Sequence, residues 1–100
     1  MSQGYVYILM NDRLNVLYVG CTNNLKKRLV HHKRRLIPGF TKRYNVHRLV
    51  YFERLPDIAA ARLRERQLKG LSRTKKEALV AVANPTRRDL FDEVRRATEL

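Results

Sequence analysis

The chain has 100 residues, of which 44% are hydrophobic and 31% are charged, and this length and composition predict one globular domain with a modest core. Lysine and arginine total 22 against 9 acidic residues, so the net charge of +13 favours nucleic acid as a ligand over an anionic membrane. A single cysteine excludes an intrachain disulfide and a cysteine-rich zinc framework, and no apolar run approaches the ~20 residues of a membrane span. We therefore expect a cytoplasmic protein that does not associate with membranes.

The first predicted elements are the two strands of a hairpin. Residues 5–9 and the run that begins at residue 17 favour strands, and the connection between them is rich in Asn and Asp, which suits a tight turn. If the hairpin is symmetric about residues 12–13, Tyr7 faces Tyr18 directly. Because side chains alternate between the two faces of a strand, the two phenols would then share one face of the sheet.

A basic helix is expected directly after the second strand, with Asn23 or Asn24 as its cap. Four residues at spacings of 4, 3 and 4 form its apolar stripe, which one imidazole interrupts: Leu25, Leu29, His32 and Leu36. The helix should end near Leu36, because Pro38 and Gly39 cannot continue it. Basic side chains of this helix and of the following loop are the expected contacts to a nucleic-acid backbone: Lys26, Lys27, Lys33, Arg34, Arg35, Lys42 and Arg43.

Residues 40–45 are predicted to form a basic loop that contains two aromatic side chains. Phe40 and Tyr44 could stack on bases there, or pack beneath the loop. No acidic residue occurs from residue 13 to residue 52, so the positive charge is concentrated in this part of the chain. A ligand that carries phosphate groups would be attracted to the same region.

Residues 48–53 are predicted to form a third strand. Regular alternation places Val50 and Phe52 on one face, and Leu49 and Tyr51 on the other. Apolar side chains on both faces predict a sheet that is covered on both sides.

A helix should follow from a cap at Asp57 to Gly70, and a carboxylate lies near the middle of its apolar face. That residue, Glu65, is the most unusual feature of the second half of the chain. One interpretation is an ion pair on the same helix, because Arg62 and Lys69 stand at spacings of three and four. The other is a functional carboxylate.

A further helix should stop before Asn84-Pro85, and a last helical turn or two should precede a tail that frays after Arg95. The elements together predict an α/β fold of the α+β type, in which helices flank a small, mainly antiparallel sheet of three strands. We expect a single domain over residues 1–100, with its core from about residue 4 to about residue 90.

Several blocks of the sequence, in order, resemble the GIY-YIG nuclease domain. The two tripeptides of the family name correspond to Tyr5-Val6-Tyr7 and Tyr18-Val19-Gly20, although Tyr5 stands where the name has glycine. Further matching blocks follow along the chain, at residues 20–25, 28–32, 40–44, 49–53, 61–70 and 84–85. The sequence is most similar to the small stand-alone bacterial members of the family, which are like the N-terminal nuclease domain of the bacterial repair excinuclease.

The resemblance implies a metal-dependent site. It places a metal ligand at Glu65, for Mg²⁺ or Mn²⁺, and it places at Arg28 the arginine that holds the scissile phosphate by paired hydrogen bonds. It also implies that a phenol activates or positions the attacking water, with a neighbouring base to help it because a free tyrosine has a pKa near 10.

The resemblance also assigns the remaining members of the site. Tyr7 is the expected general base, His32 its proton acceptor, and Tyr18 an orienting hydrogen-bond donor. Gly20 and Asn84 are expected to support the active site. Two plainer interpretations stay open: His32 could be a histidine satisfied within the core, and Asn84 could serve as a helix stop.

The function that the resemblance implies is endonucleolytic cleavage of DNA, in repair or recombination. The alternative is a non-catalytic DNA- or RNA-binding module that keeps the fold and the basic face. A ribosome-associated or RNA-processing protein would share the same electrostatics and would prefer RNA. Because the chain contains no visible second module, a partner protein is the expected source of target specificity.

Overall fold

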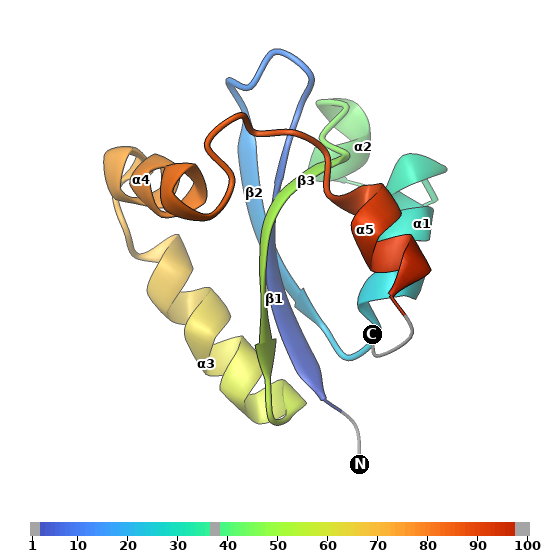
Figure 1. Cartoon of the computed structure of the whole chain (residues 1–100), viewed down its shortest axis with the longest axis vertical. Coiled ribbons are helices and arrows are strands. Elements are labelled where there is room, and N and C mark those ends of the chain that lie inside the picture. Colours follow the sequence, from blue (N-terminus) through green and yellow to red (C-terminus); the bar gives the residue numbers. More distant parts are fainter. Residues whose placement is uncertain (1–2, 37–38, 98–100) are drawn as a thin grey trace.

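Three antiparallel strands form the centre of the molecule, in the order β2-β1-β3 (Figure 1). They are β1 at Gly4–Met10, β2 at Leu17–Thr22 and β3 at Arg48–Leu55. The computed structural model describes residues 3–36 and 39–97, and five helices surround the sheet in that part of the chain. The predicted α+β fold, a small antiparallel sheet flanked by helices, is confirmed.

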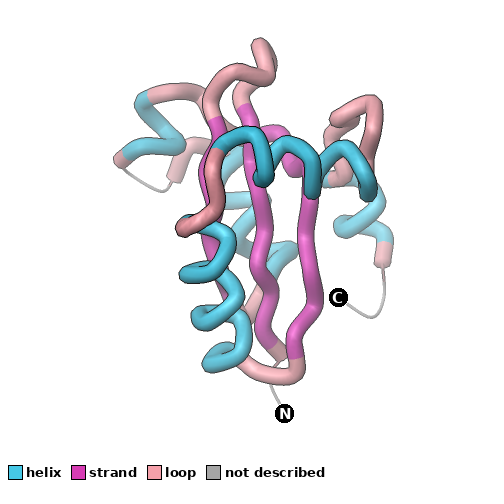
Figure 2. Tube along the Cα trace, turned by 90° about the vertical axis from the view of Figure 1, so that its left-hand side faces the viewer, coloured by secondary structure: helices cyan, strands magenta, loops and turns pink. Residues whose placement is uncertain are grey.

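Helices cover both faces of the sheet (Figure 1). On one side are α1, α2 and α5, at Leu25–Lys33, Phe40–Arg43 and Phe91–Arg96. On the other side are α3 and α4, at Ile58–Lys69 and Arg73–Ala83, which lie in front of the strands in Figure 2. Within the described residues, no helix is both long enough and apolar enough to cross a membrane.

The central strand β1 is buried along its whole length and contributes to two hydrophobic clusters. Tyr5 and Tyr7 pack with residues of α1 and α5. Val6 and Ile8 pack on the opposite face with residues of α3 and α4. The alternation of the strand therefore decides which layer each side chain reaches, and it directs Tyr7 toward α1.

The register of the hairpin differs from the symmetric register that we expected. Tyr7 pairs with Gly20 rather than with Tyr18, and the turn is centred one residue later. The Asn11 side chain stabilises this turn, because its Oδ1 atom accepts hydrogen bonds of 3.0 Å from the backbone N–H groups of residues 15–16. The prediction of a direct Tyr7 and Tyr18 pair is wrong, but a shift of two residues keeps both phenols on one face.

Strand β3 contains a β-bulge that interrupts its alternation. Ile8 pairs with Tyr51 and Leu9 pairs with Leu49, so Val50 is the extra residue. Val50 and Tyr51 consequently pack in the same hydrophobic cluster, although strict alternation would place them on opposite faces. The prediction is therefore right in placing Leu49 and Val50 on opposite faces, but it is wrong from Tyr51 onward.

Three predictions about helical segments also need correction. Helix α1 ends at Lys33 rather than near Leu36, because Arg35 adopts a left-handed φ of 56° and Leu36 is 61% exposed. The segment expected to be an irregular basic loop contains one helical turn, α2. Pro38 lies outside the described residues. Helix α5 continues to Arg96, past the expected start of the frayed tail.

Candidate active site

Three buried polar side chains form a hydrogen-bonded chain that connects β1 to two helices. The Tyr7 hydroxyl lies 3.2 Å from Nε2 of His32, and Nδ1 of the same imidazole lies 3.2 Å from the Thr41 hydroxyl. The exposed fractions of the three residues are 1%, 4% and 7%, so water competes little for these hydrogen bonds. The structure thus joins two of the predicted catalytic residues and adds Thr41, which lies in the matching block at residues 40–44 but was not predicted to belong to the site.

Burial is the main cause of the pKa shifts of Tyr7 and His32 in this hydrogen-bonded chain. It raises the pKa of Tyr7, and Tyr18 acts in the same direction, while Arg28 opposes them. Burial, followed by Arg28 and His31, lowers the pKa of His32 to about 4. At neutral pH the phenol is therefore protonated and the imidazole is neutral, so one ring nitrogen of His32 donates and the other accepts. In the tautomer that carries its proton on Nδ1, the phenol donates to Nε2 and Nδ1–H donates to the threonine hydroxyl. This tautomer can accept a proton from Tyr7.

The low pKa of His32 predicts that folding is sensitive to acid. Unfolded chains bind a proton on this histidine near pH 6.5, whereas the folded protein binds it only near pH 4, so stability falls as the pH decreases from 6.5 through 4. We expect a loss on the order of 2 kcal/mol in the free energy of unfolding, measured by urea denaturation at about pH 7 and pH 4.5. His32→Gln should remove most of this dependence and His31→Gln should keep it. An unchanged dependence in His32→Gln would refute the prediction.

Tyr18 and Gly20 lie beside the Tyr7 ring on β2. The ring centroid of Tyr18 is 6.4 Å from that of Tyr7 and 6.0 Å from that of His32. A Cβ atom on Gly20 would lie 2.6 Å from the Tyr7 hydroxyl oxygen and 2.9 Å from Cε2 of Tyr18. Glycine at this position therefore leaves room for both tyrosine rings, which any larger side chain would occupy. If Gly20 supports the candidate site, it does so by leaving this space free.

Gly20→Ala is expected to displace both tyrosine rings. The backbone of β2 is held by its pairing with β1, so the added methyl group must push the rings aside, at a cost of about 2 kcal/mol in the free energy of unfolding. Gly70→Ala is a matched control, because its Cβ would meet no atom closer than 3.5 Å and its φ of −77° suits alanine. Urea denaturation of the two variants measures the difference, and equal stabilities would show that Gly20 makes no such room.

Two charged residues act on Tyr7 from different helices. Besides burial, Arg28 on α1 lowers the pKa of Tyr7 and Glu65 on α3 raises it. The Glu65 side chain is 22% exposed, and its carboxylate lies 3.3 Å from Nζ of Lys69. The ion pair on the same helix is therefore formed, with Lys69 rather than with Arg62 as the recorded partner. The carboxylate remains partly open to solvent, so the functional interpretation also stays available.

Comparison with known proteins decides the family. Residues 3–78 match the model of the GIY-YIG catalytic domain. This chain belongs to the GIY-YIG family. One similar sequence is the UPF0213 protein of Natronomonas pharaonis, which is 39% identical over 77% of this chain and 89% of the relative. Another is the UPF0213 protein of Syntrophus aciditrophicus, which is 37% identical over 87% of this chain and 99% of the relative. The predicted resemblance to small stand-alone GIY-YIG proteins is confirmed.

A solved structure supports the same assignment. The solution NMR structure of the UPF0213 protein of Bacillus halodurans matches this GIY-YIG domain with a TM-score of 0.55 at 28% identity, and the match covers 96% of this chain and 98% of the other. In the present structure the two tripeptides of the family name lie on adjacent strands. Their last residues, Tyr7 and Gly20, are paired directly. The last residues of the two motif tripeptides therefore lie side by side, and the glycine leaves space for the Tyr7 phenol.

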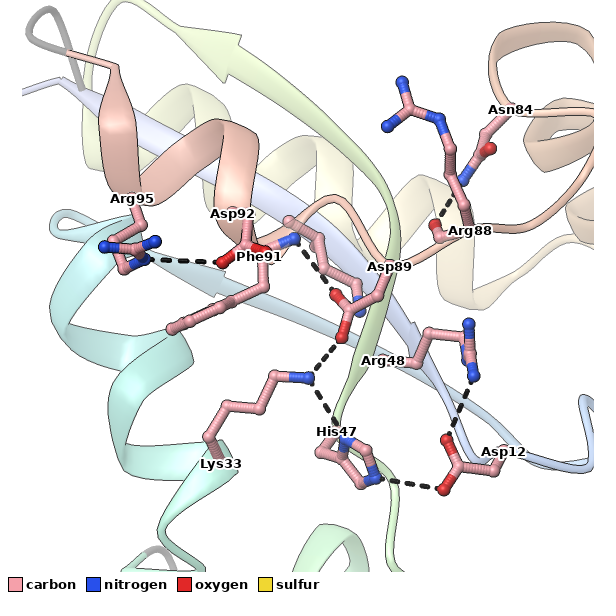
Figure 3. A network of polar contacts seen from close by, with 11 residues as sticks. Asp12, Lys33, His47, Arg48, Asn84, Arg88, Asp89, Phe91, Asp92 and Arg95 are labelled. Carbon is pink, nitrogen blue, oxygen red and sulfur yellow. Dashed lines mark hydrogen bonds and ion pairs between the residues drawn. The ribbon is translucent and has the colours of Figure 1, made fainter.

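Lys33, a predicted nucleic-acid contact of the GIY-YIG domain, points into a polar network (Figure 3). Its ammonium group forms an ion pair with Asp89 and lies 3.2 Å from Nδ1 of His47. Asp89 also accepts hydrogen bonds from the backbone N–H groups of Leu49 and Phe91, at 3.1 and 3.0 Å. Lys33 thus fastens α1 to the residue before β3 and to the segment before α5, where Asp89 is in turn bonded to β3.

The other predicted nucleic-acid contacts lie on α1, on the turn after it and on α2, and they are Lys26, Lys27, Arg34, Arg35, Lys42 and Arg43. Lys26 is half-buried, and the other five side chains are exposed. Near the start of α1, a pocket of about 320 Å³ is lined in part by Lys27 and Arg28. The GIY-YIG domain therefore carries cations both beside Tyr7 and along the neighbouring surface.

Asn84, which lies beyond the residues that match the family model, contacts backbone groups of β3 and of the segment after α4. The residue is 3% exposed, and its Nδ2 atom donates to the carbonyl groups of Val50 at 3.1 Å and Arg88 at 2.8 Å (Figure 3 shows the second contact). Val50 is the residue of the β-bulge, and β1 lies between β3 and the strand that bears Tyr18. Any support that Asn84 gives to the candidate active site therefore acts through the sheet.

Proposed function

We propose that this GIY-YIG domain is a metal-dependent endonuclease that hydrolyses phosphodiester bonds in DNA. The observation that carries the proposal is the buried hydrogen bond of 3.2 Å between Tyr7 and His32. A phenol paired with a neutral imidazole offers a route for the proton of an attacking water, and binding alone does not need such a route. Membership of the GIY-YIG family supports the same class of activity.

Each residue of the candidate site then has one task. Tyr7 accepts a proton from the attacking water as it passes its own proton to Nε2 of His32. Arg28 holds the scissile phosphate and balances the negative charge that develops on it, while Tyr18 orients the reacting groups. Because the phosphate brings negative charge near the imidazole, bound DNA favours the protonated form of His32 and offsets its low pKa.

Glu65 is the residue that we propose as the metal ligand. In residues 3–36 and 39–97, no group of three or more His, Cys, Asp and Glu side chains could hold a metal ion. A lone, partly exposed carboxylate suits Mg²⁺ or Mn²⁺, since these ions keep several waters and accept phosphate oxygens as ligands. When bound, the ion would stabilise charge on the phosphate and on the leaving oxygen. Lys69 must release the carboxylate for this to happen.

Plasmid nicking tests the proposal, with the Tyr7→Phe variant beside the wild type. We expect cleavage of supercoiled plasmid with Mg²⁺ or Mn²⁺ and none with EDTA. Tyr7→Phe keeps the ring in the core and removes the hydroxyl, so the cleavage rate should fall at least about 100-fold. Tyr5→Phe is the control, because the Tyr5 hydroxyl donates to Gln3 at 2.9 Å, away from His32. Undiminished cleavage by Tyr7→Phe would contradict the mechanism.

A non-catalytic DNA- or RNA-binding module is the second candidate function. The ion pair between Glu65 and Lys69 favours it, because a carboxylate that is neutralised by lysine needs no metal ion. This candidate predicts salt-sensitive binding of nucleic acid, no cleavage with any divalent metal, and binding that is indifferent to loss of Glu65. Tighter binding of RNA than of DNA would point to a role in RNA metabolism.

The proposed cellular setting follows from the proposed chemistry. An endonuclease of this kind would act in the cytoplasm, in DNA repair or recombination. Its target would be chosen in part by a partner protein, since larger relatives use additional domains for that purpose.

A further inference from the structure

A row of aromatic rings leads from the candidate active site to the surface at α2. Tyr18, which lies beside Tyr7 and His32, stacks on Phe40 with ring centroids 6.2 Å apart and an interplanar angle of 24°. Phe40 in turn contacts Tyr44, with centroids 4.8 Å apart. None of the tasks assigned above uses the two outer rings, Phe40 and Tyr44.

The two outer rings are exposed and surrounded by cations. Phe40 is 47% exposed and Tyr44 is 45% exposed. With Arg35, Lys42 and Arg43 they line an open pocket of about 740 Å³, and the Arg43 guanidinium carbon lies 5.5 Å from the centre of the Tyr44 ring. These five residues are called the α2 platform here. Large exposed rings beside several cations are typical of surfaces that bind single-stranded nucleic acid.

We propose that the α2 platform binds an unpaired nucleobase of the DNA strand that is cut. The inference rests on the proposed nuclease function and deepens it, because it names the substrate class. A base offers a flat face to an aromatic ring, and the phosphates on either side of it complement the three cations of the platform. In a duplex, neighbouring bases cover both faces of each base. The substrate is therefore DNA with unpaired nucleotides beside the scissile bond, such as a flap, a gap or a free single strand.

The position of Tyr18 connects the platform to the chemistry. Tyr18 belongs both to the row of rings and to the group around Tyr7, so the row gives a strand whose base stacks at Tyr44 a path toward Tyr7, on which Arg28 acts. Charge argues against a neutral apolar ligand, since residues 13–52 contain no acidic residue. An acidic peptide would satisfy the cations, but it would leave the two exposed rings without a flat partner.

Binding measured in EDTA tests the platform without any cleavage. The probes are a fluorescent oligothymidine of about 12 nucleotides and an abasic strand of the same length and charge, and the measurement is fluorescence anisotropy. Tyr44→Ala should weaken binding of oligothymidine at least about fivefold and leave binding of the abasic strand unchanged. Tyr44→Phe should bind both strands as the wild type does. Leu63→Ala, which removes an apolar side chain that is 55% exposed on α3, is the matched control and should also bind normally.

The outcomes separate the platform from the proposed function. Equal weakening on the two strands would show that the ring touches no base and would overturn the inference. Binding of a polyglutamate of the same charge with the same dependence on Tyr44 would also overturn it, in favour of a protein ligand. A wild type that shows the expected selectivity but never cleaves DNA with Mg²⁺ or Mn²⁺ would keep the platform and reject the nuclease. If the wild type cleaves DNA with metal and Tyr44→Ala binds oligothymidine normally, the nuclease function is kept and the platform is rejected.

Discussion

Glu65→Gln is expected to lower metal-dependent cleavage of plasmid DNA by about 1,000-fold or more. The amide keeps the size of the side chain and its half-buried place on α3, but it removes the charge that attracts a divalent cation. Loss of the ion pair with Lys69 should cost little stability, because Lys69 is 54% exposed and such pairs contribute only about 0.3–0.5 kcal/mol. The variant should therefore fold and bind DNA as the wild type does.

Two measurements and one control make this result specific. Cleavage is measured with Mg²⁺ and Mn²⁺, and titration calorimetry with Mn²⁺ reports metal binding independently of turnover. Glu77→Gln is the control, because Glu77 also forms an ion pair along its helix, with Arg73 at 3.2 Å. If Glu65→Gln binds Mn²⁺ and cleaves DNA normally, the metal ligand is another residue.

Asn84→Asp is expected to lower the free energy of unfolding by about 3 kcal/mol. The substitution keeps the shape of a side chain that is 3% exposed, but it replaces an N–H donor with a carboxylate oxygen. That oxygen would face the carbonyl groups of Val50 and Arg88, which Nδ2 now serves at 3.1 and 2.8 Å. The buried carbonyl of Val50 and the partly buried carbonyl of Arg88 would lose their donor, and an unpaired charge would be added beside them.

Urea denaturation measures this effect at neutral pH. Asn23→Asp is a matched control, since Asn23 is exposed and the variant carries the same change in net charge. The cleavage rate per folded molecule then distinguishes the two interpretations of Asn84. A normal rate would assign Asn84 to the helix stop and the β-bulge, and a reduced rate in the folded fraction would assign it to the active site. Equal stability of the two variants would refute the prediction.

Local patterns predicted the layers of the fold well. The prediction that Tyr7 of β1 and Tyr18 of β2 share one face is correct, because the observed register differs from the predicted one by two residues, which is the period of a strand. Asp57 acts as the expected cap of α3, where its Oδ1 atom accepts a hydrogen bond of 2.8 Å from the N–H group of Ala60. Both predictions depend on neighbours within a few residues, and such interactions leave a signal in the spacing of residues.

Register and strand irregularities were beyond the reach of those patterns. The turn of the hairpin depends on hydrogen bonds of one side chain, Asn11, and several turn lengths fit the same Asn- and Asp-rich stretch. The bulge at Val50 is stabilised from a distant part of the chain, through the side chain of Asn84. Residue types in residues 48–53 alone carry no information about that contact.

In the candidate site too, sequence motifs led to some residues, whereas contacts between distant parts of the chain were not predicted. The resemblance led to Tyr7 and His32, which the structure places within hydrogen-bond distance. Thr41 lies in the matching block at residues 40–44, but no role was assigned to it, and only its buried contact with His32 connects it to the site. Lys33 was grouped with the nucleic-acid contacts because it is basic and lies on a basic helix. Its partner Asp89 is 56 residues away, and no spacing rule predicts an ion pair across that distance.

The complete burial of β1 bears on how mutational scans of this family should be read. Almost any replacement at Tyr7 damages the core, so selection for folding alone would keep this position invariant. Arg28 and Glu65 are half-buried on helices and belong to neither hydrophobic cluster. Intolerance at Glu65 would therefore report selection for catalysis, whereas intolerance at Arg28 would report selection for catalysis or for binding of the phosphate backbone. In a saturation scan, the positions on α1 and α3 rather than Tyr7 on β1 would distinguish an active enzyme from a protein that keeps the fold without the activity.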